Sequence, residues 1–233
     1  MKKLGIYTQA ILATGLFSIG ASAWAGRPLA TEDAGVNDKG SCQLEAWRDF
    51  GKEVDHTHIA PACGVMDGLE LGLEVDMPSS MALDTHAIVG ALKWAPESLA
   101  WNGWRFGAKL STTAERAAGE SERHHANWTA LGIATYSIND QWTAHVNLGH
   151  AYDKLAKEHA EVYGVAMAYT PHERFMVFAE LNGDNKGPAT QTAGLRYWLI
   201  QDSLGLDITT SRTNATPDSQ TYGIGFGWYG LKF

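Results

Sequence analysis

The most constraining feature of this sequence is an alternation of apolar and polar side chains in segments of about ten residues. In residues 69–77 every odd position is apolar and every even position is acidic or glycine. The same period of two recurs at residues 104–111 and 203–209. This pattern predicts β-strands with one apolar and one polar face rather than amphipathic helices.

On this basis we expect about twelve strands, an all-β fold. A length near ten residues is what a tilted strand needs to cross a bilayer. The expected strands are residues 41–50, 57–65, 68–77, 83–95, 102–112, 127–138, 141–151, 159–170, 173–182, 189–199, 203–210 and 220–233.

The connections between these segments differ in length on the two sides of the expected sheet. Even-numbered connections, such as residues 139–140, are mostly tight, whereas odd-numbered ones, such as residues 113–126, are mostly longer and polar. This asymmetry predicts an antiparallel transmembrane β-barrel with short periplasmic turns and longer extracellular loops. Because twelve is even, both ends of the chain fall on the periplasmic side.

Aromatic residues gather at both ends of the expected strands, as in the aromatic belts of membrane barrels. The alternative is that these side chains are core anchors of a soluble sandwich. Trp94, Trp101, Trp104, Tyr136, Trp142, Tyr169 and Trp198 lie beside short turns, and Trp47, Trp128 and Tyr152 lie beside long loops.

The two ends of the chain carry export signals. Lys2 and Lys3 precede an apolar stretch to about residue 20 and the small-residue pattern of residues 23–25, which predicts a secretory signal peptide cleaved after Ala25. A membrane anchor is the weaker alternative, because the apolar run is short and contains polar residues. The final strand places Tyr229, Leu231 and Phe233 on one expected face. This resembles the C-terminal insertion signal of bacterial outer-membrane barrels, so lipid and the insertion machinery are expected partners.

We therefore expect three regions: a signal peptide (residues 1–25), a periplasmic N-terminal segment or small plug (residues 26–40) and an outer-membrane barrel (residues 41–233). The formal net charge of −8 argues against a nucleic-acid binder. Strand alternation directs a set of polar residues of both charge signs toward the barrel interior. The candidates for lining the lumen are Glu70, Glu74, Asp76, Asp84, His86, Arg105, Lys109, His145, Asn147, Glu180, Arg196 and Asp207.

The two cysteines, Cys42 and Cys63, fall nearly opposite each other if the first two strands form a hairpin. Export to an oxidising compartment favours a disulfide there over a metal pair.

The histidines suggest two further kinds of site. His56, His58, His124 and His125 lie in or near loops that could bind Zn²⁺ or Cu²⁺. Without a recognisable metal-binding spacing we favour solvated polar loops, with no metal and no cofactor. His86 and His145 could gate a pore as the pH changes, or could belong to a hydrogen-bonded network.

Three segments of the sequence resemble those of a known family. They are RPLATEDAG at residues 27–35, near the expected start of the mature chain, the strand at residues 69–77, and the segment at residues 91–94. The chain is similar to the outer-membrane family named for the MetA pathway of phenol degradation. The resemblance implies a barrel and brings no catalytic residues. Glu32 and Asp33 in this segment could bind a cation or form a cap or solvated turn.

The leading functional hypothesis is porin-like transport: passive passage or binding of a small solute, with hydrophobic or aromatic compounds as one option. The alternative is a structural or partner-binding barrel with a closed lumen. A lipid hydrolase is disfavoured, because no histidine is followed by serine at the spacing of outer-membrane phospholipases and no G-x-S-x-G motif occurs.

Overall fold

The computed structural model describes residues 27–52, 55–78, 86–116, 124–154, 156–214 and 219–232, with the backbone alone at residues 86, 116 and 124–126. The expected signal peptide, Asp84, Phe233 and the side chains of His86, His124 and His125 lie outside the described part of the molecule.

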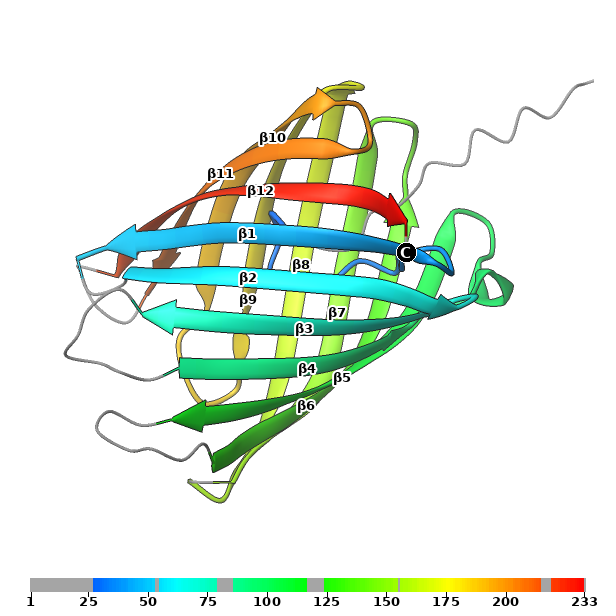
Figure 1. Cartoon of the computed structure of the whole chain (residues 1–233). Helices are drawn as coiled ribbons and strands as arrows, with labels where there is room; N and C mark the ends of the chain where they lie inside the picture. The colour runs from blue at the N-terminus through cyan, green and yellow to red at the C-terminus, as the bar shows by residue number, and fades with distance from the viewer. Residues whose placement is uncertain are drawn as a thin grey trace, which may run out of the picture.

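The described chain forms a closed antiparallel barrel of twelve strands, in which β1 pairs with both β2 and β12 (Figure 1). Both the expected fold class and the expected strand order are confirmed. The strands are β1 (Ser41–Gly51), β2 (Asp55–Met66), β3 (Leu69–Pro78), β4 (His86–Trp94), β5 (Trp104–Arg116), β6 (His124–Ser137), β7 (Trp142–Asp153), β8 (Glu158–His172), β9 (Phe175–Asp184), β10 (Thr190–Ile200), β11 (Leu204–Thr213) and β12 (Gln220–Lys232).

The strands agree with the sequence prediction to within a few residues, and the largest differences are at β5 and β6. Their pairing continues to Glu115 and His124, several residues into the segment expected to be a loop. Polar side chains do not stop a strand when the backbone amides of two neighbouring segments can still bond each other. Membrane-barrel strands therefore run on past the apolar band into the outer loops.

The short connections lie at the end of the barrel that holds the C-terminus (Figure 1). The longest of them joins β4 to β5 and contains a short 3-10 helix, η1 (Glu97–Leu99). No helix in the described ranges is long and apolar enough to cross a membrane.

The outer face of the barrel is apolar. Leu71, Leu110, Leu148, Ile208 and Ile224 each expose between 49% and 65% of their surface. The positions between such residues are buried and mostly polar or small. This is the reverse of a soluble protein and is the arrangement that lipid requires of a membrane barrel.

Aromatic side chains cover the outer face near the short turns. Trp104 stacks on Tyr136 with ring centroids 4.5 Å apart, and Trp142 stacks on Tyr169 at 4.4 Å. These residues come from neighbouring strands and form cross-strand pairs.

Two of the predicted belt residues, Trp47 and Trp198, face inward instead. Trp198 is 8% exposed and packs edge-on against Tyr229, while the Trp47 ring lies under the Arg27 guanidinium. The prediction was wrong here because it used the position of each residue along its strand. Which face a side chain occupies depends on whether its number is odd or even within the strand.

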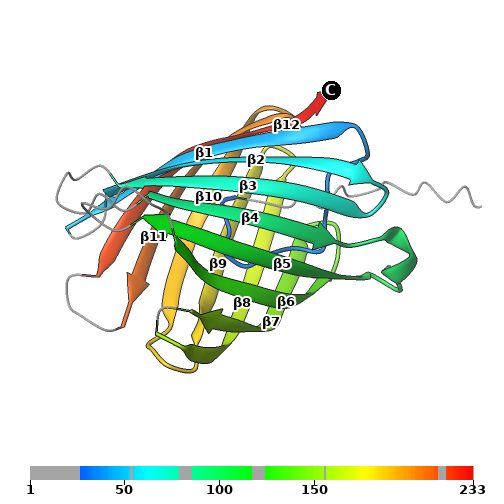
Figure 2. The same ribbon diagram turned by 60° about the horizontal axis from the view of Figure 1, so that its bottom comes forward.

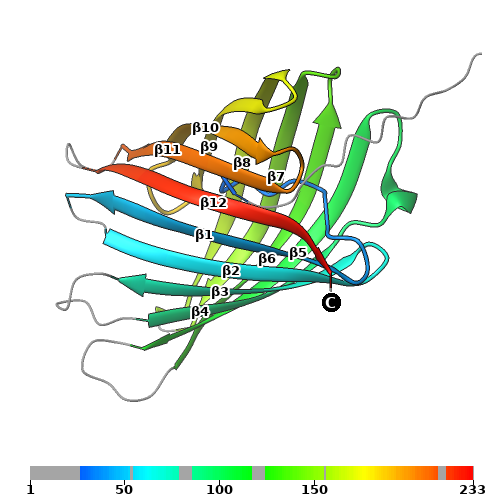
Figure 3. The ribbon, with the colours of Figure 1, turned by 45° about the horizontal axis from the view of Figure 1, so that its top comes forward.

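Residues 27–40, called the N-terminal segment below, run inside the barrel rather than along its rim (Figures 1 and 2). Figure 3 shows the same segment, in dark blue, between β12 and the strands on the far side of the barrel. It leaves the interior beside β2, where Lys39 forms a bridge with Gly64, and then continues into β1.

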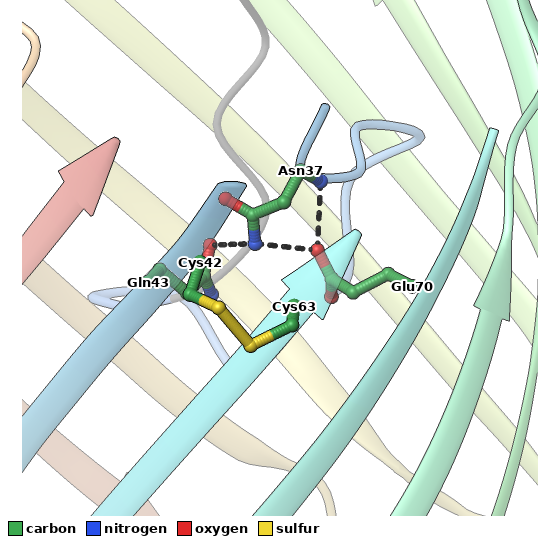
Figure 4. Close-up of a disulfide and its surroundings, with 5 residues drawn as sticks. All are labelled: Asn37, Cys42, Gln43, Cys63 and Glu70. Atoms are coloured by element: carbon green, nitrogen blue, oxygen red, sulfur yellow. Dashed lines mark hydrogen bonds between the residues drawn. A yellow bond between two sulfur atoms is a disulfide. The ribbon is translucent and has the colours of Figure 1, made fainter. Parts of the chain in front are cut away.

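The predicted disulfide is confirmed. Cys42 and Cys63 are directly paired residues of β1 and β2, and their sulfurs are bonded (Figure 4). On the inner side of the barrel, the Asn37 side chain donates to Gln43 of β1 and to Glu70 of β3. The disulfide therefore joins the two strands next to the point where the N-terminal segment leaves the interior.

The last strand departs from the predicted alternation. Leu44 pairs with Trp228 and Cys42 pairs with Leu231, so the register shifts by one residue between these pairs. Gly230 supplies the bulge, with a φ of +74° that other residues rarely adopt. Tyr229 lies before the bulge and faces inward with Gly225 and Gly227, whereas Leu231 lies after it and faces outward. The prediction that they share a face was wrong.

Candidate functional site: the barrel lumen

The N-terminal segment is held in the lumen through its backbone. The Glu180 carboxylate of β9 accepts hydrogen bonds from the amides of Ala30 and Thr31, at 3.0 and 2.7 Å. Asn147 of β7 bonds both the amide and the carbonyl of Glu32. Buried strand side chains thus satisfy backbone groups that have no sheet partner, which is required when a loop is buried.

Further contacts fix the later part of the segment. Thr135 of β6 accepts from the amide of Ala34 at 2.8 Å, and Glu70 of β3 accepts from the amide of Asn37 at 2.8 Å. The segment also passes close to β2 at Gly64, where an added Cβ would lie 2.2 Å from the Asn37 carbonyl oxygen. A glycine is needed there because two backbones meet.

A cluster of opposite charges lies where the segment faces β4 and β5. The Glu32 carboxylate forms ion pairs with Lys109 and, at 3.0 Å, with Lys93, whose ammonium also lies 3.5 Å from Asp33. Burial opposes ionisation of Glu32, but the two lysines outweigh it and lower the pKa of Glu32 to about 2. Of the roles that the sequence leaves open for Glu32 and Asp33, the described contacts include pairing with cationic side chains of the barrel wall.

A second buried network joins the beginning of the segment to β10, β11, β12 and β1. Asp207 accepts from Arg27 at 3.2 Å and from Arg196 at 2.9 Å. Arg196 also donates to the Tyr229 hydroxyl, which in turn donates to Glu45 at 2.6 Å. The network compensates buried charges of both signs, which would be costly if left unpaired.

Beside the segment the lumen retains a cavity of about 440 Å³, bounded by the inner faces of β1 to β5. Its charged lining contains five carboxylates and three basic side chains. The carboxylates are those of Glu32, Glu45, Asp49, Glu70 and Glu74, and the bases are Arg27, Lys93 and Lys109.

A third cluster lies on β1, β2 and β3, towards the ends that lead to the outer loops. His56 bonds Asp76 at 2.8 Å, and His58 bonds Glu74 at 2.9 Å. The His58 ring is stacked on Trp47, with centroids 4.5 Å apart and planes 5° from parallel. His58 and Glu74 also line the cavity.

Most of the sequence candidates with described side chains meet in these clusters or bind the N-terminal segment. His145 is buried and bonds Thr135, as a member of a polar network. Arg105 lies apart from them, near the short turns, where it pairs with Glu97 of η1.

Sequence reasoning missed Lys93, Glu45 and Tyr229 as interior residues. Lys93 and Glu45 stand at alternating positions of predicted strands, so a strict odd-and-even count would have found them. The same count places Tyr229 on the inner face with Gly223, Gly225 and Gly227, and it fails only beyond the bulge at Gly230.

The closed barrel, its apolar outer face and its charged lumen define the class: a transmembrane β-barrel with the outer-membrane porin fold. The chain belongs to the family described as "Uncharacterised conserved protein UCP029691", whose model matches residues 13–226. No curated protein sequence matches the chain significantly.

Solved structures of similar fold are outer-membrane proteins. KdgM porin has a TM-score of 0.62 with 10% identity, covering 80% of this chain and 98% of that one, and it has also been solved in complex with disordered oligogalacturonate. NanC porin has a TM-score of 0.59 with 9% identity, covering 82% of this chain and 100% of that one. The outer membrane protein Omp33 of Acinetobacter baumannii has a TM-score of 0.54 with 9% identity, covering 85% of this chain and 100% of that one. Identities this low show a shared fold alone.

Proposed function

We propose that this protein is an outer-membrane channel for the passive passage or binding of a small hydrophilic solute. The observation that carries the proposal is the charged cavity of about 440 Å³ that remains in the lumen beside the N-terminal segment. A wall that closely surrounds a solute with fixed charges selects it by charge as well as by size.

The lining favours hydrophilic solutes over the hydrophobic or aromatic compounds suggested by the sequence. An apolar solute would displace water from carboxylates and ammonium groups without replacing their hydrogen bonds, which is unfavourable. The excess of carboxylates in the cavity favours neutral or cationic solutes over anions.

The N-terminal segment acts in this proposal as a plug that narrows the lumen. Its support is the set of backbone hydrogen bonds to Glu70, Thr135, Asn147 and Glu180. The same contacts favour the second candidate function, a closed barrel that binds a partner through its outer loops. The two differ in whether the cavity connects both sides of the membrane.

The remaining parts of the proposal concern export and kinship. We infer a signal peptide cleaved after Ala25, insertion through the C-terminal strand, and an outer-membrane location with short turns in the periplasm. The resemblance to the MetA-pathway family of phenol degradation also stays a proposal, because the family match on residues 13–226 carries no link to it.

The reversal potential of the refolded protein in a planar bilayer with a KCl gradient tests the proposed charge preference. We expect a reversal potential shifted from zero toward the equilibrium potential of K⁺, which indicates a preference for cations. Neutralising two cavity carboxylates in the double variant E74Q/D49N should move the reversal potential toward zero. The exposed variant E97Q is the matched control and should leave it unchanged. Anion preference in the wild type would contradict the proposal.

A further inference from the structure

The cluster at the outer end of the lumen has the composition of a metal site. One nitrogen from each of His56 and His58 and one carboxylate oxygen of Asp76 lie within 4.8 Å of one another. Within the described ranges this is the one group of three or more His, Cys, Asp or Glu side chains with such spacing. The three residues come from two paired strands, with His58 directly opposite Asp76.

The contacts of His58 leave a lone pair facing negative charge. Its Nδ1 lies 2.9 Å from Glu74, and because a carboxylate accepts, Nδ1 is the donor. An uncharged imidazole then has an unprotonated Nε2. That nitrogen lies 3.9 Å from Asp76 and 3.7 Å from Asp49. Three electron-pair donors that face one another repel, and a cation between them would turn this repulsion into attraction.

The neighbouring groups also orient these ligands as metal sites require. A ligating histidine usually donates its other ring N–H to a carboxylate, as His58 does to Glu74. Stacking on Trp47 fixes the plane of the His58 ring, and the Trp47 indole N–H bonds Asp49 at 3.0 Å.

The spacing suits a small transition-metal ion. Ligand atoms around tetrahedral Zn²⁺ are about 3.3 Å apart for metal–ligand bonds of about 2.0 Å. The distances of 2.8 Å from His56 Nδ1 to Asp76 and 3.9 Å from His58 Nε2 to Asp76 lie on either side of that value. His56 Nδ1 donates a hydrogen bond to Asp76, so the ion would take the place of that proton, which is released on binding. Imidazole nitrogens select Zn²⁺, Cu²⁺ or Ni²⁺ over Mg²⁺ and Ca²⁺, which prefer oxygen ligands alone.

We infer that His56, His58 and Asp76 bind one divalent transition-metal ion, of the Zn²⁺ class, at the outer mouth of the lumen. Glu74 and Asp49 orient the ligands and balance charge. Because His58 and Glu74 line the cavity, the bound ion would stand where a solute enters it. The inference deepens the proposed function by placing a cation site on the pathway, but binding itself does not depend on transport.

Calorimetric titration of the refolded, metal-free protein in detergent with Zn²⁺ tests the inference. We expect one Zn²⁺ per chain at this site, and no binding of Mg²⁺ under the same conditions. The variants H58A and D76N should each weaken that binding at least about tenfold, and E74Q should weaken it by about 10- to 100-fold as an orienting partner.

The matched control is H159A. His159 belongs to a pair with His150 at 2.8 Å, on β8 and β7, which are not neighbours of β2 or β3 in the barrel. This variant should retain the wild-type stoichiometry and affinity. Heat-modifiable gel mobility confirms that each variant is folded, and D76N serves if H58A does not fold.

Two results would overturn the inference. Absence of stoichiometric Zn²⁺ binding would mean that the cluster is a polar network held by its hydrogen bonds alone. Zinc binding that is unaffected by H58A and D76N would place the ion elsewhere on the chain. Because the titration involves no membrane transport, either result is distinguishable from a failure of the channel proposal.

Discussion

At the scale of single residues, Glu32 connects the N-terminal segment to the barrel wall through both its side chain and its backbone. Its carboxylate pairs with Lys93 and Lys109, and its backbone bonds Asn147. Loss of its charge would remove the anion that Lys109 and the buried Lys93 share, leaving Lys93 with Asp33 alone. Such a loss is more damaging than that of an exposed pair.

We predict that E32Q lowers the free energy of unfolding at pH 7 by about 2 kcal/mol, the size of a hydrogen bond to a charged group. Because the folded protein lowers the pKa of Glu32 to about 2, this stabilisation is complete above the unfolded value near 4.5. It is lost as the pH falls through about 2. Urea unfolding of the refolded barrel, followed by tryptophan fluorescence, measures the difference between the two proteins.

The pH series provides the decisive comparison. Wild type and E32Q should converge in stability between pH 4.5 and 2, because protonation removes the same charge from the wild type. The control E97Q changes a carboxylate whose side chain is 78% exposed and should unfold like the wild type at every pH. A gap between wild type and E32Q that persists at pH 2 would contradict the assigned role of the charge.

At the scale of elements, the close approach of the N-terminal segment to the strands depends on positions that hold no side chain. A Cβ at Gly164 of β8 would lie 2.9 Å from the Thr31 hydroxyl oxygen. At Gly72 of β3, which lines the same lumen, the nearest atom would be 3.6 Å away. Two glycines on inner faces therefore differ in what a methyl group would displace.

We predict that G164A shifts the segment and increases the single-channel conductance of the refolded protein, whereas G72A leaves the conductance close to the wild-type value. The methyl group at Gly164 forces Thr31 away from its contact, and an ordinary van der Waals distance at Gly72 requires no movement. Equal conductance of the two variants would argue against a tightly packed segment.

The hairpin of β1 and β2 is the element that the disulfide constrains. We predict that C42S/C63S lowers the free energy of unfolding by about 3 kcal/mol, as expected for a closed loop of this size. Urea unfolding measures the loss, and the wild type treated with a reductant should show the same value. An unchanged midpoint in both cases would mean that the barrel hydrogen bonds alone fix this hairpin.

The sequence predicts those parts of the molecule that follow from local alternation. Strand number, strand order, the antiparallel barrel and the Cys42–Cys63 bond all depend on periodicity and on turn positions. The prediction of inward and outward faces fails where the period is interrupted, as at Gly230, beyond which Leu231 faces outward although Tyr229 faces inward. No local signal indicates such a bulge beyond the presence of a glycine.

The path of the N-terminal segment could not be predicted for a different reason. Its contacts join Thr31 to Glu180 and Glu32 to Asn147, which are more than a hundred positions apart in the chain. A sequence read on its own reveals periodicity but no pairing between distant irregular segments. The lumen clusters, including His58 with Glu74 and Asp49, arise only when the barrel closes.

At the scale of the whole molecule, the barrel wall and the N-terminal segment have different structural roles. The wall buries its backbone hydrogen bonds and exposes an apolar face to lipid. The segment fills part of the interior and leaves a charged cavity along β1 to β5. The space left in the lumen of this twelve-stranded barrel is thereby reduced to about the size of a small solute.

The most direct test of this account is single-channel recording in a planar bilayer, with and without residues 27–40, after heat-modifiable gel mobility has verified both barrels. We predict small current steps for the full-length mature protein and larger steps after the deletion, because the segment narrows an open path without closing it. Absence of current in both forms would contradict a channel and favour a closed barrel that binds a partner.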